Sequence, residues 1–310
     1  MNTHNAHYSV LLNEAITALN LDPSGKYVDA TYGRGGHSAL LLAQLSNDGA
    51  LLAIDKDADA VNDAQAKFAD DARFTIKHGS FASLQQFVEQ QGWQGEVDGI
   101  LLDLGVSSPQ LDQAERGFSF QHDGPLDMRM DTSSGMSASQ WIATASETEI
   151  ADVLYEYGEE RFSRRIAKAI VTARNEQPIN TTKQLSTIVA AANPKWEKHK
   201  DPATRSFQAI RIYINNELDD LKQCLQQAVT VLKSGGRLVV ISFHSLEDRI
   251  VKTFIREMEN TNDLPPDLPV QHIESNAVLK RIKKPVKANE QEVLENVRSR
   301  SAIMRVAEKV

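Results

Sequence analysis

The chain has 310 residues, of which 41% are hydrophobic and 25% charged, a balance typical of a globular protein with one or two domains. No apolar run approaches the roughly 20 residues needed to cross a bilayer, which excludes a membrane-spanning helix. Cys224 is the only cysteine, which excludes an intrachain disulfide and a cysteine-rich zinc site. No basic segment followed by an apolar one opens the chain, so we expect a cytoplasmic location.

The net charge of −8 conceals an asymmetry along the chain. Residues 1–150 carry 8 Lys/Arg against 21 Asp/Glu, whereas residues 151–310 carry 26 against 21. Basic residues are densest in 161–174, 195–205 and 280–305. Such runs are often solvated helix faces, but they also suit a surface that binds a polyanion, beside a pocket for a neutral or cationic cofactor.

The first hundred residues alternate between helix and strand patterns. A helix is expected over 8–20, with Ser9 as its N-cap. Strands are then expected at 27–30, 50–54, 73–78 and 97–105, with helices near 38–45, 57–68 and 83–91 between them. Strand–helix units of this length predict a parallel, right-handed, Rossmann-like sheet, in which ligands bind beyond the carboxyl ends of the strands.

A glycine cluster follows the first strand, at Gly33, Gly35 and Gly36. Without a Cβ, glycine permits positive φ and lets a ligand approach the backbone closely. Asp55 ends the second strand about 20 residues later, the spacing at which an acidic group reaches ribose hydroxyls, and Asp103 ends the fourth. These residues predict a nucleotide-type pocket.

The alternation stops after residue 110. Helical periodicity runs through 147–157, 160–175 and 181–192, and no strand is evident between Gly105 and Gly236. One long helix is expected over 202–232, then strands at 237–243 and 301–307. We therefore predict a sheet domain in two parts, 1–110 and 213–310, separated by a mainly helical insertion at 111–212.

Two features of the predicted pocket favour S-adenosylmethionine over a dinucleotide. The turn lacks the later glycine that lets a helix pack closely beneath a pyrophosphate. The strand ends carry Asp29, Asp55 and Asp103, which repel phosphates but suit a sulfonium, a ribose diol and an α-ammonium group. For Asp29, a cap at the strand end is an alternative explanation.

Ser107, Ser108 and Pro109 directly follow the fourth strand. In methyltransferases that act on an exocyclic amine, a short proline-containing loop at this position accepts hydrogen bonds from the amine. The amine is a weak nucleophile because its lone pair is delocalised into the ring, and acceptors that hold its hydrogens localise that lone pair. Catalysis then consists of positioning and polarisation and needs no metal. An ordinary turn is the alternative.

The histidines do not predict a metal site. His37, His78 and His244 lie far apart in the sequence, and no His-x-x-x-His pair occurs. His37 is expected to form a wall of the pocket at the start of a helix. His244, at the end of the fifth strand, is a candidate substrate contact.

Five stretches together resemble the RsmH (MraW) family of bacterial small-subunit ribosomal RNA methyltransferases. The stretches are Thr31–His37, Leu101–Asp112, Arg116–Phe120, Gly124–Met130 and Ile241–Arg249, and the resemblance runs from about His7 to Arg305. It implies a Rossmann-like class I S-adenosylmethionine-dependent methyltransferase sheet with an inserted all-helical domain. It also implies transfer of a methyl group to the 4-amino group of cytosine 1402 in 16S rRNA of the small ribosomal subunit.

The resemblance also implies roles for individual residues. Cofactor contacts fall on Gly35, Gly36, His37, Asp55, Phe81, Asp103 and Gln110, with Phe81 as an apolar wall for the adenine. The group that polarises the amine is not fixed by the resemblance, and we expect the Ser107–Pro109 loop to do so, helped by Asp103. The helical insertion is expected to help recognise RNA. The oligomeric state stays open, with a homodimer as one option.

Three other functions remain open at this point. The acidic net charge suits a methyltransferase for a protein or a small molecule. A non-catalytic ribosome-assembly factor would use the basic insertion alone. A nicotinamide-dependent dehydrogenase would use the same glycine turn for a dinucleotide.

Overall fold

The structure is a computed structural model that describes residues 9–195, 201–259 and 277–310. The chain forms two compact units, one made of Met1–Gly105 and Leu218–Val310 and the other of Val106–Glu217. The sequence predicts the boundaries of the insertion at 110/111 and 212/213, and in the structure the second unit begins after residue 105 and ends at residue 217, so each boundary differs by five residues. Residues 1–8, which include the start of the resemblance at His7, lie outside the described residues. Among the described residues no helix has the length and apolarity to span a membrane.

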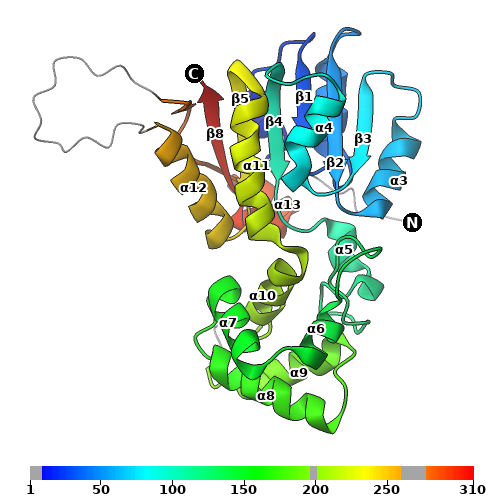
Figure 1. Cartoon of the computed structure of the whole chain (residues 1–310), viewed down its shortest axis with the longest axis vertical. Helices are drawn as coiled ribbons and strands as arrows, with labels where there is room; N and C mark the ends of the chain where they lie inside the picture. Colours follow the sequence, from blue (N-terminus) through cyan, green and yellow to red (C-terminus); the bar gives the residue numbers. More distant parts are fainter. Residues whose placement is uncertain (1–8, 196–200, 260–276) are drawn as a thin grey trace, which may run out of the picture. The chain divides into compact units, whose positions relative to one another are not determined.

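The first unit is built on one sheet with the strand order β3-β2-β1-β4-β5-β8-β6 (Figure 1). The strands are β1 (Lys26–Asp29), β2 (Ala50–Asp55), β3 (Phe74–His78), β4 (Val97–Asp103), β5 (Leu232–Ser242), β6 (Leu279–Arg281), β7 (Val286–Lys287) and β8 (Ile303–Lys309). Strands β1 to β5 pair in parallel, whereas β8 runs antiparallel to β5 and also pairs β6 and β7. The Rossmann-like prediction is confirmed, and so is the return of the last strand to the sheet.

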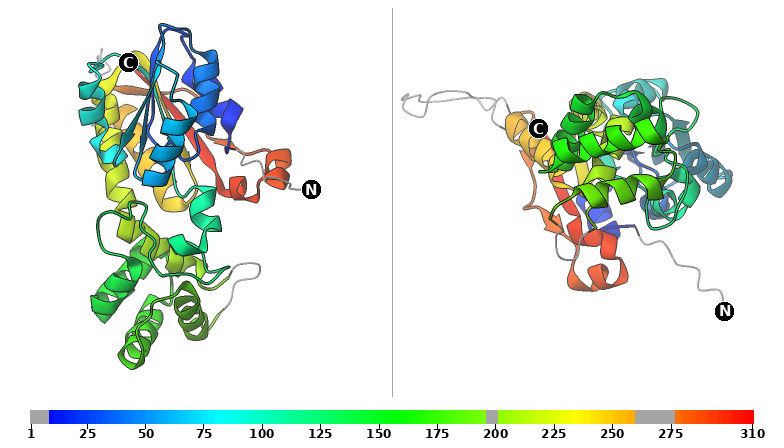
Figure 2. Two further views of the ribbon diagram at one scale, coloured as in Figure 1. Left: turned by 90° about the vertical axis from the view of Figure 1, so that its right-hand side faces the viewer. Right: turned by 90° about the horizontal axis from the view of Figure 1, so that it is seen from below.

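Helices cover both faces of this sheet (Figures 1 and 2). Alternate strand residues point to opposite faces, so Val28 and Leu102 pack with α4 (Leu84–Gln90), α11 (Glu217–Val231) and α12 (Ser245–Glu259). Tyr27 and Leu101 pack on the other face with α1 (Leu12–Leu19) and α2 (Gly36–Gln44). The short α13 (Glu290–Glu295) precedes β8, and α3 (Ala58–Lys67) follows β2. Burial on both faces explains why the central strands are almost purely apolar.

The second unit is helical and has its own core. Its elements are α5 (Ser108–Asp112), η2 (Ala114–Arg116), α6 (Ala138–Thr144), α7 (Glu147–Gly158), α8 (Ser163–Glu176), α9 (Thr182–Ala192) and α10 (Thr204–Asn215). Leu154, Ile166, Ile170, Leu185 and Ile210 are fully buried in this core. The three helices predicted at 147–157, 160–175 and 181–192 are confirmed. The loop-rich stretch 111–146 contains the end of α5 and two short helical elements, η2 and α6, that its polar composition did not indicate.

Two helix predictions are wrong in detail. The single helix expected over 202–232 is two helices, because Asn216 adopts a left-handed backbone with φ 56° between α10 and α11. The helix expected from residue 8 begins at Leu12, and Leu11 rather than Ser9 occupies its N-cap position. A local pattern of apolar residues continues through both sites, so periodicity alone does not mark either break.

Candidate functional site

The carboxyl ends of the parallel strands gather acidic side chains at one edge of the sheet. Asp29 pairs with Ala53 on one side and Leu101 on the other, so Asp55 and Asp103 each lie two residues further along their strands. The strand order reverses between β1 and β4, and this switch point is where open α/β sheets bind their ligands. The predicted convergence of the three aspartates is therefore observed within the first unit.

Asp29 has a structural role. It is 1% exposed, and its carboxylate accepts hydrogen bonds from Ser38 Oγ at 2.6 Å and from the Thr31 N–H at 3.3 Å. Burial raises the pKa of Asp29 to about 6, against the effect of these two donors. Asp29 thus ties β1 to α2, which agrees with a cap at the strand end.

The glycine turn connects β1 to α2. Gly33 and Gly35 have φ of 59° and 69°, and the Gly35 N–H donates to the Tyr32 carbonyl at 2.8 Å. A Cβ at Gly35 would lie 2.5 Å from the Tyr32 ring, and one at Gly36 would overlap Ser9 Oγ. A Cβ at Gly33 would meet nothing closer than a carbonyl oxygen at 4.0 Å. Gly35 and Gly36 are thus required by the protein's own packing, and Gly33 is the glycine whose Cβ position is open.

Asp55 holds this turn in place. One of its carboxylate oxygens accepts the Gly33 N–H at 2.7 Å and the other accepts the Asp57 N–H at 2.8 Å. Burial raises the pKa of Asp55 to about 6, although both backbone donors act to lower it. Each carboxylate oxygen has a second lone pair, so Asp55 retains the capacity to accept ligand hydroxyls.

Asp103 and His37 form a pair at the end of β4. His37 Nδ1 lies 3.6 Å from Asp103 Oδ2, and the Asp103 N–H donates to Thr31 Oγ1 at 2.6 Å. Asp103 Oδ1 and His37 Nε2 are buried with no hydrogen-bond partner among the described residues. Burial, followed by the nearby charges of Asp29 and Glu247, raises the pKa of Asp103 well above its ordinary value. Burial lowers the pKa of His37 to about 4, so the imidazole is neutral at pH 7.

An unpartnered buried carboxyl oxygen is unusual, because desolvating it costs free energy unless a donor replaces the lost water. Asp103 Oδ1 therefore marks a position for a hydrogen-bond donor or cation of a ligand. His37 lies beside this position at the start of α2, and its role as a wall of a cofactor pocket stays a prediction.

Phe81 begins a short 3₁₀ helix, η1 (Phe81–Ser83), beyond the end of β3. Asp220 of α11 fixes this turn, since it accepts hydrogen bonds from Ser80 Oγ and Lys56 Nζ, both at 2.6 Å. Asp220 is 6% exposed, and Lys56 directly follows Asp55. None of the three residues of this partly buried network was predicted from the sequence to belong to the site. Its members are separated by as many as 164 residues, and no local pattern connects them.

His244 lies at the end of β5, the neighbour of β4. Its Nε2 is 3.0 Å from Glu247 Oε1, and Glu247 Oε2 accepts the Phe243 N–H at 2.8 Å. Glu247 is 2% exposed, and although it lies in the Ile241–Arg249 stretch it is not among the predicted site residues. Asp248, the next residue, binds Arg305 of β8 through two hydrogen bonds of 2.7 and 2.9 Å. Both carboxylates thus anchor the start of α12.

Ser107, Ser108, Pro109 and Gln110 fall in the second unit, where they form the first turn of α5. The buried Gln110 side chain accepts the Ser107 N–H at 2.9 Å in a capping box, and Pro109 lies in the first turn. This cap gives Gln110 a structural role. The cofactor contact expected of Gln110 and the amine contact expected of the loop stay predictions.

Comparison with known proteins identifies relatives over nearly the whole chain. The model of the MraW methylase family matches residues 4–310. The chain is 56% identical over 304 residues to the ribosomal RNA small subunit methyltransferase H of Hydrogenovibrio crunogenus, covering 98% of this chain and 96% of that protein. It is 57% identical over 304 residues to the protein of the same name from Legionella pneumophila, with coverage of 98% and 99%. A solved structure titled as a putative rRNA-methylase from Clostridium thermocellum aligns with a TM-score of 0.45 and 11% identity, over 98% and 97% of the two chains.

We predict that Gly35→Ala destabilises the first unit more than Gly92→Ala does. Both glycines have φ near 70°, so each substitution incurs the left-handed strain of about 1–2 kcal/mol. Only Gly35 faces the Tyr32 ring, which packs against Phe74 and whose hydroxyl donates to Asp63 at 3.2 Å. We therefore expect Gly35→Ala to lower the free energy of unfolding by about 1–3 kcal/mol beyond the Gly92→Ala control in urea titrations. Equal losses would show that Tyr32 does not constrain the turn.

We predict that Asp103→Asn stabilises the protein at neutral pH. The pKa of Asp103 is raised in the folded protein, so the folded state is most stable when Asp103 is protonated. This stabilisation is complete below about pH 4 and is lost as the pH rises through the pKa of the folded state. The stability difference between the Asn variant and the parent should therefore be small at pH 4 and grow toward pH 8, as measured by thermal unfolding. A less stable Asn variant at pH 8 would mean that the folded protein supplies a partner for this carboxylate.

Proposed function

Because the chain belongs to the MraW methylase family, we propose that it transfers a methyl group from S-adenosylmethionine to the 4-amino group of cytosine 1402 in 16S rRNA. That it is a methyltransferase with S-adenosylmethionine as its cofactor follows from the family. The rRNA of the small ribosomal subunit as substrate follows from the names of relatives more than 55% identical over 98% of the chain. The exact base and atom are our proposal, together with a cytoplasmic site of action.

The residues at the sheet edge fit the cofactor. Gly33 has an open Cβ position, Asp55 can accept two ribose hydroxyls, and Asp103 Oδ1 lacks the donor that an α-ammonium group would provide. Phe81, half-buried at the end of β3, suits the adenine ring. Three carboxylates at one edge favour a cation and disfavour the pyrophosphate of a dinucleotide. The observation that carries this assignment is the unpartnered Asp103 Oδ1.

When bound, S-adenosylmethionine supplies a methyl group activated by a positively charged sulfur. The chain itself has to orient a weakly nucleophilic amine and accept its hydrogens. We assign this to Asp103 and to the Ser107–Pro109 loop, which follows Asp103 by four residues. Polarisation by such acceptors, with the amine held in line, contributes several kcal/mol to catalysis.

The amine nitrogen also has to lose a proton after it gains the methyl group. Asp103 suits this task, because its raised pKa makes it a better proton acceptor than an exposed aspartate. His37, buried and neutral beside it, restricts how Asp103 can turn. For the second unit we propose a role in binding RNA, in keeping with the basic residues of α8.

The proposed reaction is tested with small ribosomal subunits from a strain that lacks the modification. We expect radiolabel from methyl-labelled S-adenosylmethionine to enter 16S rRNA at one cytosine, and nuclease digestion to release N4-methylated cytidine. Asp103→Asn should reduce the rate by at least 100-fold while the variant stays folded. Label in ribosomal protein, or in another base, would refute the assignment, and a reduced dinucleotide that binds the site would favour a dehydrogenase.

Cofactor affinity should depend on pH through Asp55. Its ionised form accepts ribose hydroxyls, and its pKa is raised to about 6, so affinity should be nearly constant above pH 7 and fall about tenfold between pH 7 and pH 5. Calorimetric titration over pH 5–8 measures this. Asp55→Asn should bind weakly at every pH, without the step. The pKa of Asp29 is also about 6. If the fall in affinity persists in the Asp55→Asn variant, it is therefore caused by Asp29 rather than by Asp55.

A further inference from the structure

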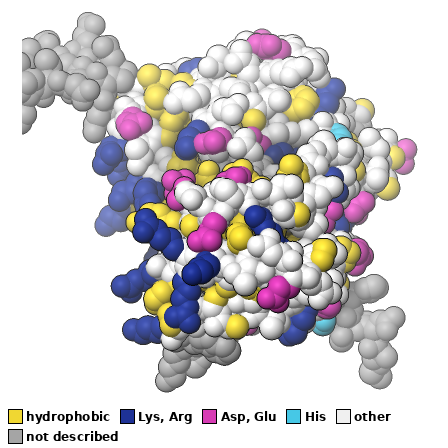
Figure 3. Space-filling model, turned by 60° about the horizontal axis from the view of Figure 1, so that its bottom comes forward, with side chains coloured by type: hydrophobic (Ala, Val, Ile, Leu, Met, Phe, Trp, Pro, Cys, Tyr) yellow, Lys and Arg dark blue, Asp and Glu magenta, His cyan; other side chains and the backbone are white. Residues whose placement is uncertain are grey.

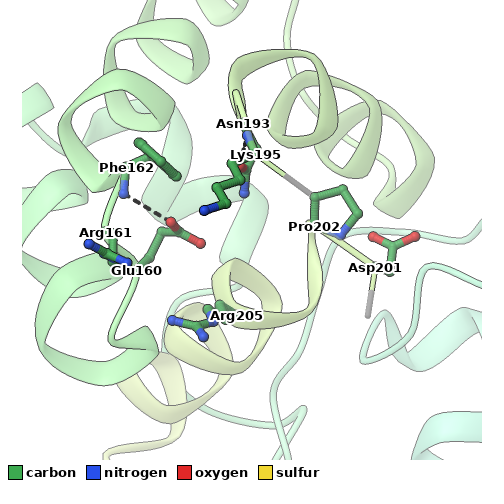
Figure 4. A pocket seen from close by; sticks show the side chains of 8 residues that line it. All are labelled: Glu160, Arg161, Phe162, Asn193, Lys195, Asp201, Pro202 and Arg205. Carbon is green, nitrogen blue, oxygen red and sulfur yellow. Dashed lines mark hydrogen bonds between the residues drawn. The ribbon is translucent and has the colours of Figure 1, made fainter. Parts of the chain in front are cut away.

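A small, open pocket lies in the helical unit, and none of its lining residues belongs to the sheet domain (Figure 4). Three segments form it: the turn that leads into α8, the chain just after α9, and the start of α10. Each segment contributes one cation, Arg161, Lys195 and Arg205 respectively. Cations that converge from three separate segments require the tertiary fold, so this arrangement is more than a run of charge along one helix.

Two of these cations, Arg161 and Lys195, are available for an external anion. Arg161 and Lys195 are exposed, and no ion pair is found for either of them in the described part of the chain. Arg205 Nη1 donates to the Glu159 carbonyl at 2.7 Å, which fixes its guanidinium at the pocket. A guanidinium that is already positioned loses less conformational entropy when it binds a further acceptor.

Two carboxylates also line the pocket, and both are bound by backbone groups. Glu160 is 3% exposed, and its Oε1 accepts the Phe162 N–H at 2.9 Å just before α8 (dashed in Figure 4). Asp201 Oδ1 accepts the Ala203 N–H at 2.8 Å just before α10. These carboxylates therefore serve the starts of the two helices, and the pocket keeps an excess of positive charge.

The positive charge continues along α8. Arg164, Arg165 and Lys168 are exposed, and their spacing of three and four residues places these three cations on one side of α8, just after Arg161. Residues 161–174 contain five basic residues and no acidic residue. In Figure 3, Lys and Arg side chains gather along one side of the surface in view, whereas Asp and Glu are scattered. From Arg164 to Lys168 the row extends about 6 Å along the helix, and it can contact phosphates of an RNA strand.

We propose that this pocket grips a phosphodiester group of the substrate RNA, with the α8 row contacting the phosphates that follow it. That the bound polyanion is RNA rests on the proposed function. The new element is the set of residues that hold the RNA backbone. Contacts of this kind carry no base information, so the site supplies affinity and register, and the base is selected elsewhere.

The test compares Arg161→Gln, Lys195→Gln and their double variant with Lys183→Gln. Lys183 is an exposed lysine of the same unit, and it begins α9 at the end opposite Lys195, about 16 Å along an 11-residue helix. Binding of purified small subunits is measured by filter retention at several salt concentrations, without turnover. Each pocket variant should bind about tenfold more weakly, and the slope of log affinity against log salt should flatten by about one for each lost contact. Lys183→Gln should behave as the parent.

Turnover separates this inference from the proposed function. The pocket variants should raise KM for the subunit with kcat within about twofold of the parent, and their calorimetric affinity for S-adenosylmethionine should be unchanged. Pocket variants that bind subunits as tightly as Lys183→Gln would overturn the inference even if cytosine is methylated. If cytosine is not methylated but the variants lose RNA affinity and salt dependence, the pocket stands and the proposed reaction fails.

Discussion

The desolvation of acidic side chains at the ends of β1, β2 and β4, complete at Asp29 and partial at Asp55 and Asp103, is the constraint on which the site depends. Removing these carboxylates from water costs free energy, and the hydrogen bonds that the fold supplies offset this cost to a different extent at each of them. The Asp29 carboxylate accepts a hydrogen bond from Ser38, and the Asp55 carboxylate accepts one from a backbone N–H of the glycine turn. Asp103 is left with an unpartnered oxygen, so the cost is retained at the position where a ligand can relieve it. The glycine turn depends on the same arrangement, since the Asp55 carboxylate fixes Gly33.

The two units divide the electrostatic task. The sheet edge concentrates negative charge in a buried setting, which suits a small cation, whereas α8 displays positive charge on an exposed face, which suits a polyanion. Beside the cationic pocket, the carboxylates of Glu160 and Asp201 accept backbone N–H groups at the starts of α8 and α10. An average over the whole chain, with its net charge of −8, conceals both features.

Local signals predicted much of this structure, and their failures have a common cause. Apolar runs that end in glycine or aspartate located the parallel strands, Asp55 and Asp103, because these patterns are complete within a few residues. The break at Asn216 and the capping role of Gln110 depend on backbone angle and on a single side-chain rotamer, which composition does not encode. The Lys56–Ser80–Asp220 network and the three-segment cationic pocket arise only when distant segments meet. In each case the deciding information lies outside the pattern of apolar residues: in one backbone angle, in one rotamer, or in a contact between distant segments.

The pairing of β4 with β5 has a consequence for synthesis of the chain. Asp103 and its partner Ile241 are separated by the whole helical unit, so the growing chain carries β4 as an unpaired edge until β5 emerges. At 5–20 residues per second this interval is on the order of 10 s, far longer than helices need to form. The helical unit, whose contacts are local, can thus fold first and shorten the loop that β4 and β5 must close. Faster closure of this loop shortens the time in which the β4 edge can pair with another nascent chain.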